Sequence, residues 1–98
     1  MTDDDAVGPV LQAGALAQAI VAAIRACNPQ VDVIDRGGYL RVLSPVRCVL
    51  RRAALEQAAG RPVRLPGDLE AVMSSFRGNL VVSDNEARWE LPGAVGES

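Results

Sequence analysis

The sequence contains no histidine and no lysine, and the absence of histidine excludes several classes of chemistry. Histidine is the usual general base near neutral pH and the commonest protein ligand of metal ions. No serine or cysteine has a plausible activating base, so nucleophilic catalysis has little support either. We therefore expect a protein that is not an enzyme, with no catalytic residue, no metal site and no cofactor.

Cysteine and aromatic residues are scarce as well. Cys27 and Cys48 lie 21 positions apart in apolar surroundings, so they show no metal-ligand spacing and predict two reduced core thiols. Aromatic side chains on adjacent strands, on which RNA bases would stack, are missing. The net charge of −2 gives no basic field that would hold nucleic acid. We expect no nucleic-acid partner.

Long apolar runs are also missing. The longest, Ala13 to Ile24, is rich in alanine and contains Gln18, and it is shorter than the roughly 20 residues that span a bilayer. The acidic start from Met1 to Asp5 lacks the basic region of a signal peptide. These features predict a cytoplasmic protein with no membrane partner.

What is present fits one small domain, because 98 residues suffice for a single core. Residues 1–6 read as a disordered acidic tail, residues 7–91 as the domain, and residues 92–98 as a flexible C-terminal tail. Hydrophobic spacing and turn residues predict an α+β fold of antiparallel strands and helices, in the order β-α-β-β-β-α-α-β-β.

Individual elements follow from local patterns. The sequence predicts helices over Gly14–Cys27, Arg52–Ala59 and Asp68–Phe76. Strands are expected over Val7–Gln12, Val31–Asp35, Tyr39–Leu43, Val46–Leu50, Leu80–Ser83 and Ala87–Leu91. Asn28 should close the first helix in a left-handed cap, and Ser44-Pro45 should turn the chain between two strands. Phe76 and Trp89 are predicted to be buried.

Two groups of side chains allow more than one interpretation. Arg51 and Arg52 begin a helix, where the dipole disfavours positive charge, and with Arg47 they form either an internally paired cluster or a surface for a partner's carboxylates. Tyr39 and Arg41 share one strand face, either as a packed pair or as an exposed recognition face.

Several short blocks of sequence, in order, resemble a known family. They are Val7-Gly8-Pro9, Asn28-Pro29, Asp35-Arg36 with Tyr39 and Arg41, Leu55-Glu56-Gln57 leading into Gly60-Arg61-Pro62, Leu69-Glu70, Ser75-Phe76-Arg77-Gly78 and Asp84. The chain resembles the effector proteins of bacterial multicomponent diiron monooxygenases, nearest to those of the toluene (aromatic) monooxygenases. The methane monooxygenase regulatory protein B and the phenol hydroxylase coupling protein are more distant relatives.

The resemblance implies a cofactor-free subunit, monomeric when free, whose partner is a diiron hydroxylase. Such a subunit docks near the hydroxylase active site and modulates turnover, substrate access and regiospecificity of aromatic hydroxylation. A rival interpretation is a small-molecule-sensing regulatory domain of the ferredoxin-like type, which depends only on the alternation of strands and helices.

A docking surface can be predicted from the same blocks. The first helix is more apolar than one core requires, Gly8 leaves the entry to that helix sterically open, and the Ser75-to-Gly78 block carries small and polar residues that permit close approach. The predicted hydroxylase-binding residues are Val7, Gly8, Pro9, Asn28, Ser74, Ser75, Phe76, Arg77, Gly78 and Asn79. The alternative is that these are ordinary turn and capping residues, in which case the Arg47-Arg51-Arg52 cluster is the next candidate.

Overall fold

The structure is a computed structural model that describes residues 5–92 of the chain. The tails expected at the two ends therefore lie mostly outside the described residues, and Ala6 already belongs to the first strand. Seven strands and three helices follow one another in the order β1-α1-β2-β3-β4-α2-α3-β5-β6-β7, which confirms the predicted α+β class and adds one strand to the predicted order.

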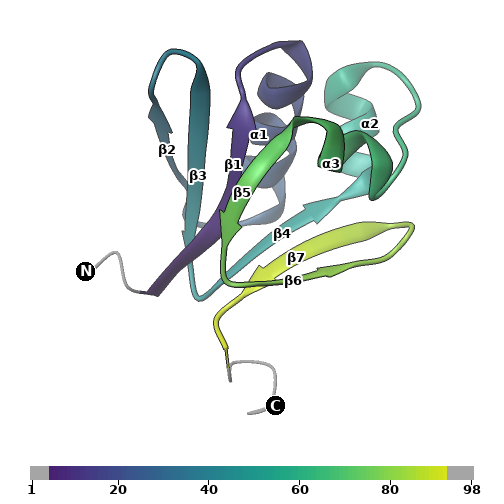
Figure 1. Cartoon of the computed structure of the whole chain (residues 1–98). Helices are drawn as coiled ribbons and strands as arrows, with labels where there is room; N and C mark the ends of the chain where they lie inside the picture. Colours follow the sequence, from purple (N-terminus) through teal and green to yellow (C-terminus); the bar gives the residue numbers. More distant parts are fainter. Residues whose placement is uncertain (1–4, 93–98) are drawn as a thin grey trace.

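Four strands form the larger of two antiparallel sheets (Figure 1). Its order is β2-β3-β1-β5, with bounds Asp32–Asp35 for β2, Tyr39–Pro45 for β3, Ala6–Gln12 for β1 and Met73–Arg77 for β5. The N-terminal strand β1 is thus central, and β5 is an edge strand.

The second sheet has three strands in the order β4-β7-β6, with bounds Arg47–Arg51 for β4, Glu86–Glu90 for β7 and Asn79–Val82 for β6. It lies at an angle to the first (Figure 1). The chain passes directly from the larger sheet to the smaller one at Val46, between β3 and β4, and again at Gly78, between β5 and β6.

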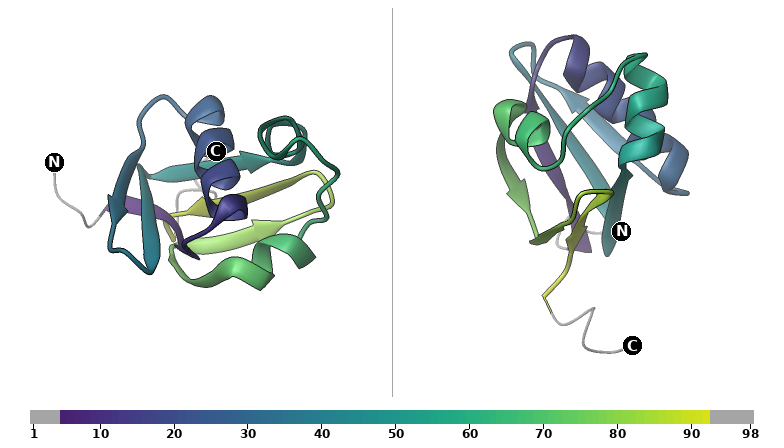
Figure 2. Two further views of the ribbon diagram at one scale, coloured as in Figure 1. Left: turned by 90° about the horizontal axis from the view of Figure 1, so that it is seen from above. Right: turned by 90° about the vertical axis from the view of Figure 1, so that its right-hand side faces the viewer.

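Three helices complete the fold. Helix α1 (Ala15–Cys27) packs against α2 (Arg52–Ala59) and β4, while the short helix α3 (Gly67–Val72) leads into β5. Figure 2 shows α1 and α2 together on one side of the molecule and α3 on the other. The two-sided burial of α1 explains its apolar composition without any external partner.

The core lies between the sheets and the helices. Its largest fully buried side chains come from both sheets and from the helices, and they include Leu11, Ile24, Leu50, Leu69 and Trp89. The burial of Trp89 was predicted from its place in the terminal hairpin and is confirmed. Helix α2 ends at Gly60, which adopts the left-handed conformation (φ 71°) expected of a helix-ending glycine.

Two glycines permit a close approach of backbones that a side chain would prevent. A Cβ at Gly8 would lie 2.1 Å from the carbonyl oxygen of Val42, and one at Gly78 would lie 2.8 Å from that of Glu90. Their φ values of +147° and +96° also disfavour other residues. Gly8 therefore belongs to the packing of the core, and it does not open the entry to the first helix.

Three local predictions are wrong. The helix expected to run to Phe76 ends at Val72, because the next residues hydrogen-bond to β1 as a strand. Asn28 has extended dihedrals (φ −134°, ψ 143°) in place of a left-handed cap. The turn expected at Ser44-Pro45 falls at Val46, whose φ is +68°, and both earlier residues remain in β3.

Candidate functional site

The face of the larger sheet that points away from the core carries a continuous row of side chains. The strand registers place Ile34 of β2 opposite Arg41 of β3, Arg41 opposite Val10 of β1, and Val10 opposite Ser75 of β5. Residues directly opposite in a sheet share a face, so this row crosses all four strands. We call this surface the open face, formed by Val10, Gln12, Ile34, Tyr39, Arg41, Ser75 and Arg77.

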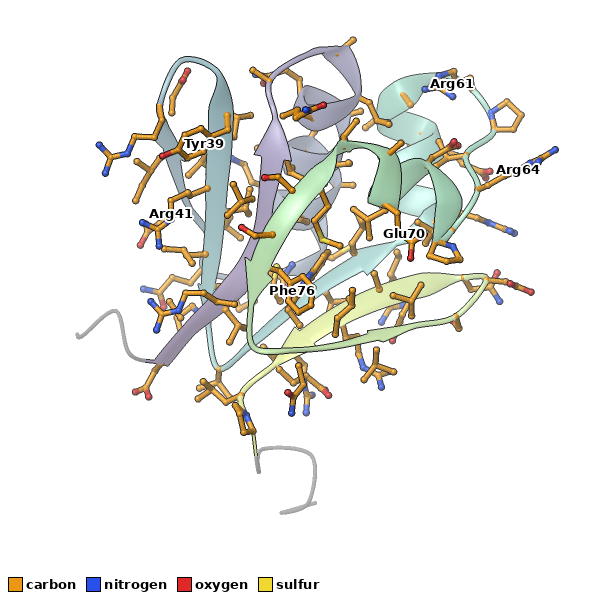
Figure 3. All side chains as sticks on the ribbon, viewed as in Figure 1. Tyr39, Arg41, Arg61, Arg64, Glu70 and Phe76 are labelled. Atoms are coloured by element: carbon orange, nitrogen blue, oxygen red, sulfur yellow. The ribbon has the colours of Figure 1, made fainter. Side chains whose placement is uncertain are left out.

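A hollow of about 640 Å³ lies on the open face. Its lining comes from β1, from β3 with the turn before it, and from β5: Val10, Gln12, Gly38, Tyr39, Arg41, Ser74, Ser75, Phe76 and Arg77. Figure 3 shows Tyr39 and Arg41 projecting from β3 and Phe76 from β5. Tyr39 and Phe76 are 41% and 42% exposed, which is high for large side chains in strands. The hollow is open to solvent along the sheet.

The charge on the open face is positive. Arg41 and Arg77 both line the hollow, and neither takes part in an ion pair within residues 5–92. Among the described residues no aspartate or glutamate lines it. By register, Asp32 lies on the same side of the sheet, two positions from Ile34 on the outer strand. The arrangement leaves two guanidinium groups free to bind carboxylates.

The first group of predicted docking residues is buried. Val7 is fully inaccessible, Pro9 belongs to the fully buried side chains, and Gly8 is tightly packed against Val42. The backbone of this segment hydrogen-bonds to β3 and β5. The structure therefore leaves these three residues no side-chain surface for a partner.

Asn28 has a structural position as well. Its amide nitrogen donates to the carbonyl oxygens of Ile24 (2.7 Å) and Val49 (2.8 Å), and its Oδ1 accepts from the amide of Val49 (3.0 Å). The side chain thus joins the end of α1 to β4 and satisfies an unpaired carbonyl of the helix end. Its hydrogen-bonding groups are occupied within the protein.

The second group of predicted docking residues, Ser74 to Asn79, runs from the edge strand β5 of the larger sheet into β6 of the smaller sheet. Ser74, Ser75, Phe76 and Arg77 are exposed on β5, Gly78 forms the corner, and exposed Asn79 lies opposite Glu90 in the smaller sheet. The prediction that Phe76 is buried is wrong, because Phe76 belongs to an edge strand and not to the apolar side of a helix. Ser74 to Arg77 all line the hollow, but by register only Ser75 and Arg77 share the open face with Val10, because Phe76 lies opposite buried Pro9.

Of the three arginines Arg47, Arg51 and Arg52, two are paired within the chain, and Arg51 has no ion pair among the described residues. Arg47 Nε lies 2.9 Å from Glu90 Oε2, Arg88 pairs with both Glu86 (2.7 Å) and Glu90 (3.4 Å), and Arg52 lies 4.0 Å from Glu56. The outer face of the smaller sheet, formed by Arg47, Val49, Arg51, Glu86, Arg88 and Glu90, therefore neutralises most of its own charge.

The chain has two cysteine thiols, Cys27 and Cys48. Both cysteines are free, and Cys48 is fully buried on the inner side of β4. Burial raises the pKa of the Cys48 thiol to about 12, with a smaller contribution from Cys27. A thiol with such a pKa is protonated and unreactive at neutral pH.

The sequence indicated part of this site and missed the rest. Tyr39 with Arg41 and the Ser75-to-Gly78 block were both singled out, but nothing in the sequence showed that β1 brings them together. Val10 and Gln12 were missed, because apolar and polar residues do not alternate along Val7–Gln12, and the two more open positions on either side of buried Leu11 appear only in the structure.

Neither a metal centre nor a membrane span emerges from the described part of the chain. Residues 5–92 hold no group of three or more potential His, Cys, Asp or Glu ligands. No helix within that range is long and apolar enough to cross a bilayer.

Comparison with known proteins gives one family and consistent relatives. The profile of the MmoB/DmpM family matches residues 5–90. The effector subunit of the alkene monooxygenase system of Xanthobacter autotrophicus (strain ATCC BAA-1158 / Py2) is 48% identical over 89 residues, which cover 89% of this chain and 87% of that protein.

Two solved structures are similar in fold. A chain in the phenol hydroxylase–regulatory protein complex superposes with a TM-score of 0.78 at 21% identity, covering 87% of this chain and 97% of that one. The soluble methane monooxygenase regulatory protein B gives a TM-score of 0.67 at 21% identity, covering 92% and 67%. At this identity the two structures show a shared fold.

Proposed function

The chain belongs to the MmoB/DmpM family, and from this membership we propose that it docks on the diiron hydroxylase of a multicomponent monooxygenase as its non-catalytic effector subunit. The observation that carries the proposal is the 48% identity to an alkene monooxygenase effector over nearly the whole of both chains. The absence of histidine from the sequence is consistent with a subunit that contributes no metal ligand or general base of that kind.

The effect of such a subunit is a shift of the hydroxylase between conformations. A protein that binds one conformation of its partner better than another by about 1–3 kcal/mol changes their ratio several-fold to about a hundredfold. In this way the effector modulates turnover, substrate access and regiospecificity. The substrate of the hydroxylase is a hydrocarbon; the sequence favoured an aromatic one, and the relative acts in an alkene system. We place the complex in the cytoplasm.

We propose that the open face is the docking surface. It brings Ser75 and Arg77 of β5 together with Tyr39 and Arg41, it is hollowed, and it exposes aromatic and arginine side chains of the kind enriched in protein interfaces. The rival function, sensing of a small molecule, gains no support from a hollow that lies open on a sheet surface, because small-molecule sites enclose most of their ligand.

The effector role is tested by adding the protein to its cognate hydroxylase and reductant system. We expect higher turnover and a sharper product distribution at saturating protein, with no change in the number of redox centres. Unchanged product yield and regiochemistry would show that the effector assignment is wrong.

The docking face is tested by placing the same new side chain on each sheet. Ser75→Arg introduces a bulky charge at the centre of the open face, whereas Val81→Arg introduces it on the exposed β6 strand of the smaller sheet. Both sites are exposed, so stability should change by less than about 1 kcal/mol.

We expect Ser75→Arg to weaken hydroxylase binding and activation at least tenfold, while Val81→Arg binds like the parent. Equal binding by the two variants would move the docking surface away from the open face. Asn79→Asp alone should have little effect, so that the single variants Ser75→Arg and Asn79→Asp separate the two halves of the predicted segment, and the double variant should bind like Ser75→Arg.

A further inference from the structure

The open face differs from the outer face of the smaller sheet in the state of most of its arginines, although Arg51 there, like Arg25, Arg36, Arg61 and Arg64 elsewhere, also has no ion pair within residues 5–92. Arg41 and Arg77 line the hollow without any ion pair in residues 5–92, whereas Arg47, Arg52 and Arg88 each have a carboxylate partner. The protein as a whole is acidic, with a net charge of −2, so this local excess of positive charge runs against its overall balance. A positive patch on an acidic protein is selective for a partner that presents negative charge at one place.

The Cα atoms of the two arginines have a spacing that the strand register defines. Arg41 lies opposite Val10, and Arg77 lies opposite Gly8, two residues earlier along β1. Strands lie about 4.8 Å apart and residues rise about 3.4 Å, so the two Cα atoms are separated by roughly 12 Å across the sheet. Val10 and Ser75 lie between them and carry no charge. The face therefore has a neutral centre with one cation on each side.

This spacing corresponds to two turns of an α-helix, which rise about 11 Å. A diiron hydroxylase builds its metal site from packed helices, and the surface over such a site is helical. We infer that the open face recognises an acidic helical surface of the hydroxylase, in which carboxylates two turns apart pair with Arg41 and Arg77. A small or apolar residue between these carboxylates then packs over Val10 and Ser75. This inference rests on the proposed function.

Arginine suits such a contact because its planar group donates two parallel hydrogen bonds to one carboxylate. Lysine, which forms a point-charge contact, would keep the attraction and lose the paired geometry. Because the sites are partly exposed in the free protein, added salt should screen the attraction and slow the encounter of the two proteins.

The experiment measures the affinity of the full-length chain for its cognate holo-hydroxylase between 50 and 300 mM NaCl. We expect the parent to bind progressively more weakly as salt rises. Arg41→Gln and Arg77→Gln should each weaken binding about 5- to 20-fold at low salt and should flatten the salt dependence. Arg41→Lys and Arg77→Lys should keep the salt dependence while binding more weakly than the parent.

Two matched variants remove an exposed arginine elsewhere. Arg51→Gln lies on the outer face of the smaller sheet, and Arg64→Gln lies in the loop before α3. Both should bind like the parent with the same salt dependence. Unchanged unfolding midpoints for all variants show that binding, and not folding, is being measured.

The outcomes separate the two proposals. If the parent activates the hydroxylase but the variant carrying both Arg41→Gln and Arg77→Gln keeps its affinity and salt dependence, the acidic-partner inference is overturned and the effector function stands. Equal weakening by Arg51→Gln or Arg64→Gln overturns it too, because the attraction is then a property of total charge. If the parent neither binds nor activates the hydroxylase, the proposed function itself fails.

Discussion

The open face of the larger sheet and the outer face of the smaller sheet both carry arginines, but only the smaller sheet has the carboxylates to match. Glu90, whose side chain is 3% exposed, lies against Arg47 and Arg88, and Glu86 pairs with Arg88 again. On the open face Arg41 and Arg77 have no such partner among the described residues.

The aromatic residues repeat this contrast. Trp89 of the smaller sheet is fully buried, whereas Tyr39 and Phe76 of the larger sheet are about two-fifths exposed. The smaller sheet thus pairs Arg47 and Arg88 within the chain, although Trp89 Nε1 has no hydrogen-bond partner in residues 5–92, and the larger sheet leaves both charge and aromatic area exposed. A surface that is incomplete in the free protein is the better candidate for a surface completed by a partner.

The largest effect expected from this comparison concerns the two aromatic residues. Trp89→Ala should destabilise the protein by about 3–5 kcal/mol, because a fully buried side chain leaves a cavity. Phe76→Ala should cost about 1 kcal/mol or less in the same denaturant titration, because Phe76 is 42% exposed. Similar losses for both variants would show that the two sheets do not differ in this way.

Removing the charge of Glu90 tests the paired face next. Glu90→Gln should lower the free energy of unfolding by about 1–2 kcal/mol, because two guanidinium groups lose their shared carboxylate in a nearly dry position. Arg77→Gln on the open face serves as the control and should change stability by less than about 0.5 kcal/mol. An unchanged free energy of unfolding in Glu90→Gln would mean that the ion pairs of the smaller sheet contribute nothing to folding stability.

The buried thiol of Cys48 should make the free energy of unfolding depend on pH. Burial raises the pKa of this thiol in the folded state to about 12 from an ordinary value of 9.0, so folding favours the protonated form. The stabilisation is complete below pH 9 and is lost as pH rises toward 12, by about 1.4 kcal/mol per pH unit. Unfolding measured from pH 8 to pH 10.5 should show this slope in the parent.

The control for that slope is Cys48→Ala, which should lack this contribution, while Cys27→Ala should retain it. An identical pH dependence in the parent and in Cys48→Ala would show that Cys48 titrates alike in both states. The native parent should also expose no reactive thiol at Cys48 until it unfolds.

The smallest effect concerns the two corners at which the chain crosses between sheets. Gly78 adopts a positive φ without a side chain, but Val46 adopts φ +68° with a β-branched one, which is strained. Val46→Asn should therefore stabilise the protein by about 0.5–1 kcal/mol, because asparagine tolerates this conformation. Val46→Ala, which keeps a Cβ, should gain less. A lower free energy of unfolding in Val46→Asn would show that Val46 is not strained in the parent.

Much of the fold could be predicted because its signals are local. The spacing of apolar residues from Leu16 to Cys27, the Gly37-Gly38 turn and the helix end at Gly60 each reflect short-range chemistry. The end of the helix near Val72 was mispredicted for the opposite reason. The spacing of Leu69, Val72, Met73 and Phe76 is helical, but pairing with β1, more than sixty residues away, turns the last residues into a strand.

The candidate site shows the same limit. The blocks that carry the family resemblance include stretches that the structure brings together, since Tyr39, Arg41 and Ser75-to-Arg77 all line one hollow. They pointed equally to Gly8 and Asn28, which the fold uses for packing and for hydrogen bonds. A motif in the sequence does not distinguish a residue that builds the scaffold from one that the scaffold displays, because that difference arises only from tertiary packing.

The corner at Gly78 has a consequence for the behaviour of the protein in solution. It joins the edge strand of one sheet directly to the edge strand of the other, so β5 and β6 form a continuous border whose outer backbone groups have no neighbouring strand within residues 5–92. Such borders invite other chains to add a strand and to aggregate. Short strands, the charge of Arg77 and the polar side chains of Ser74, Ser75 and Asn79 work against that reaction. Apolar substitutions on β5 would therefore carry a cost in solubility, which the polar character of this border avoids.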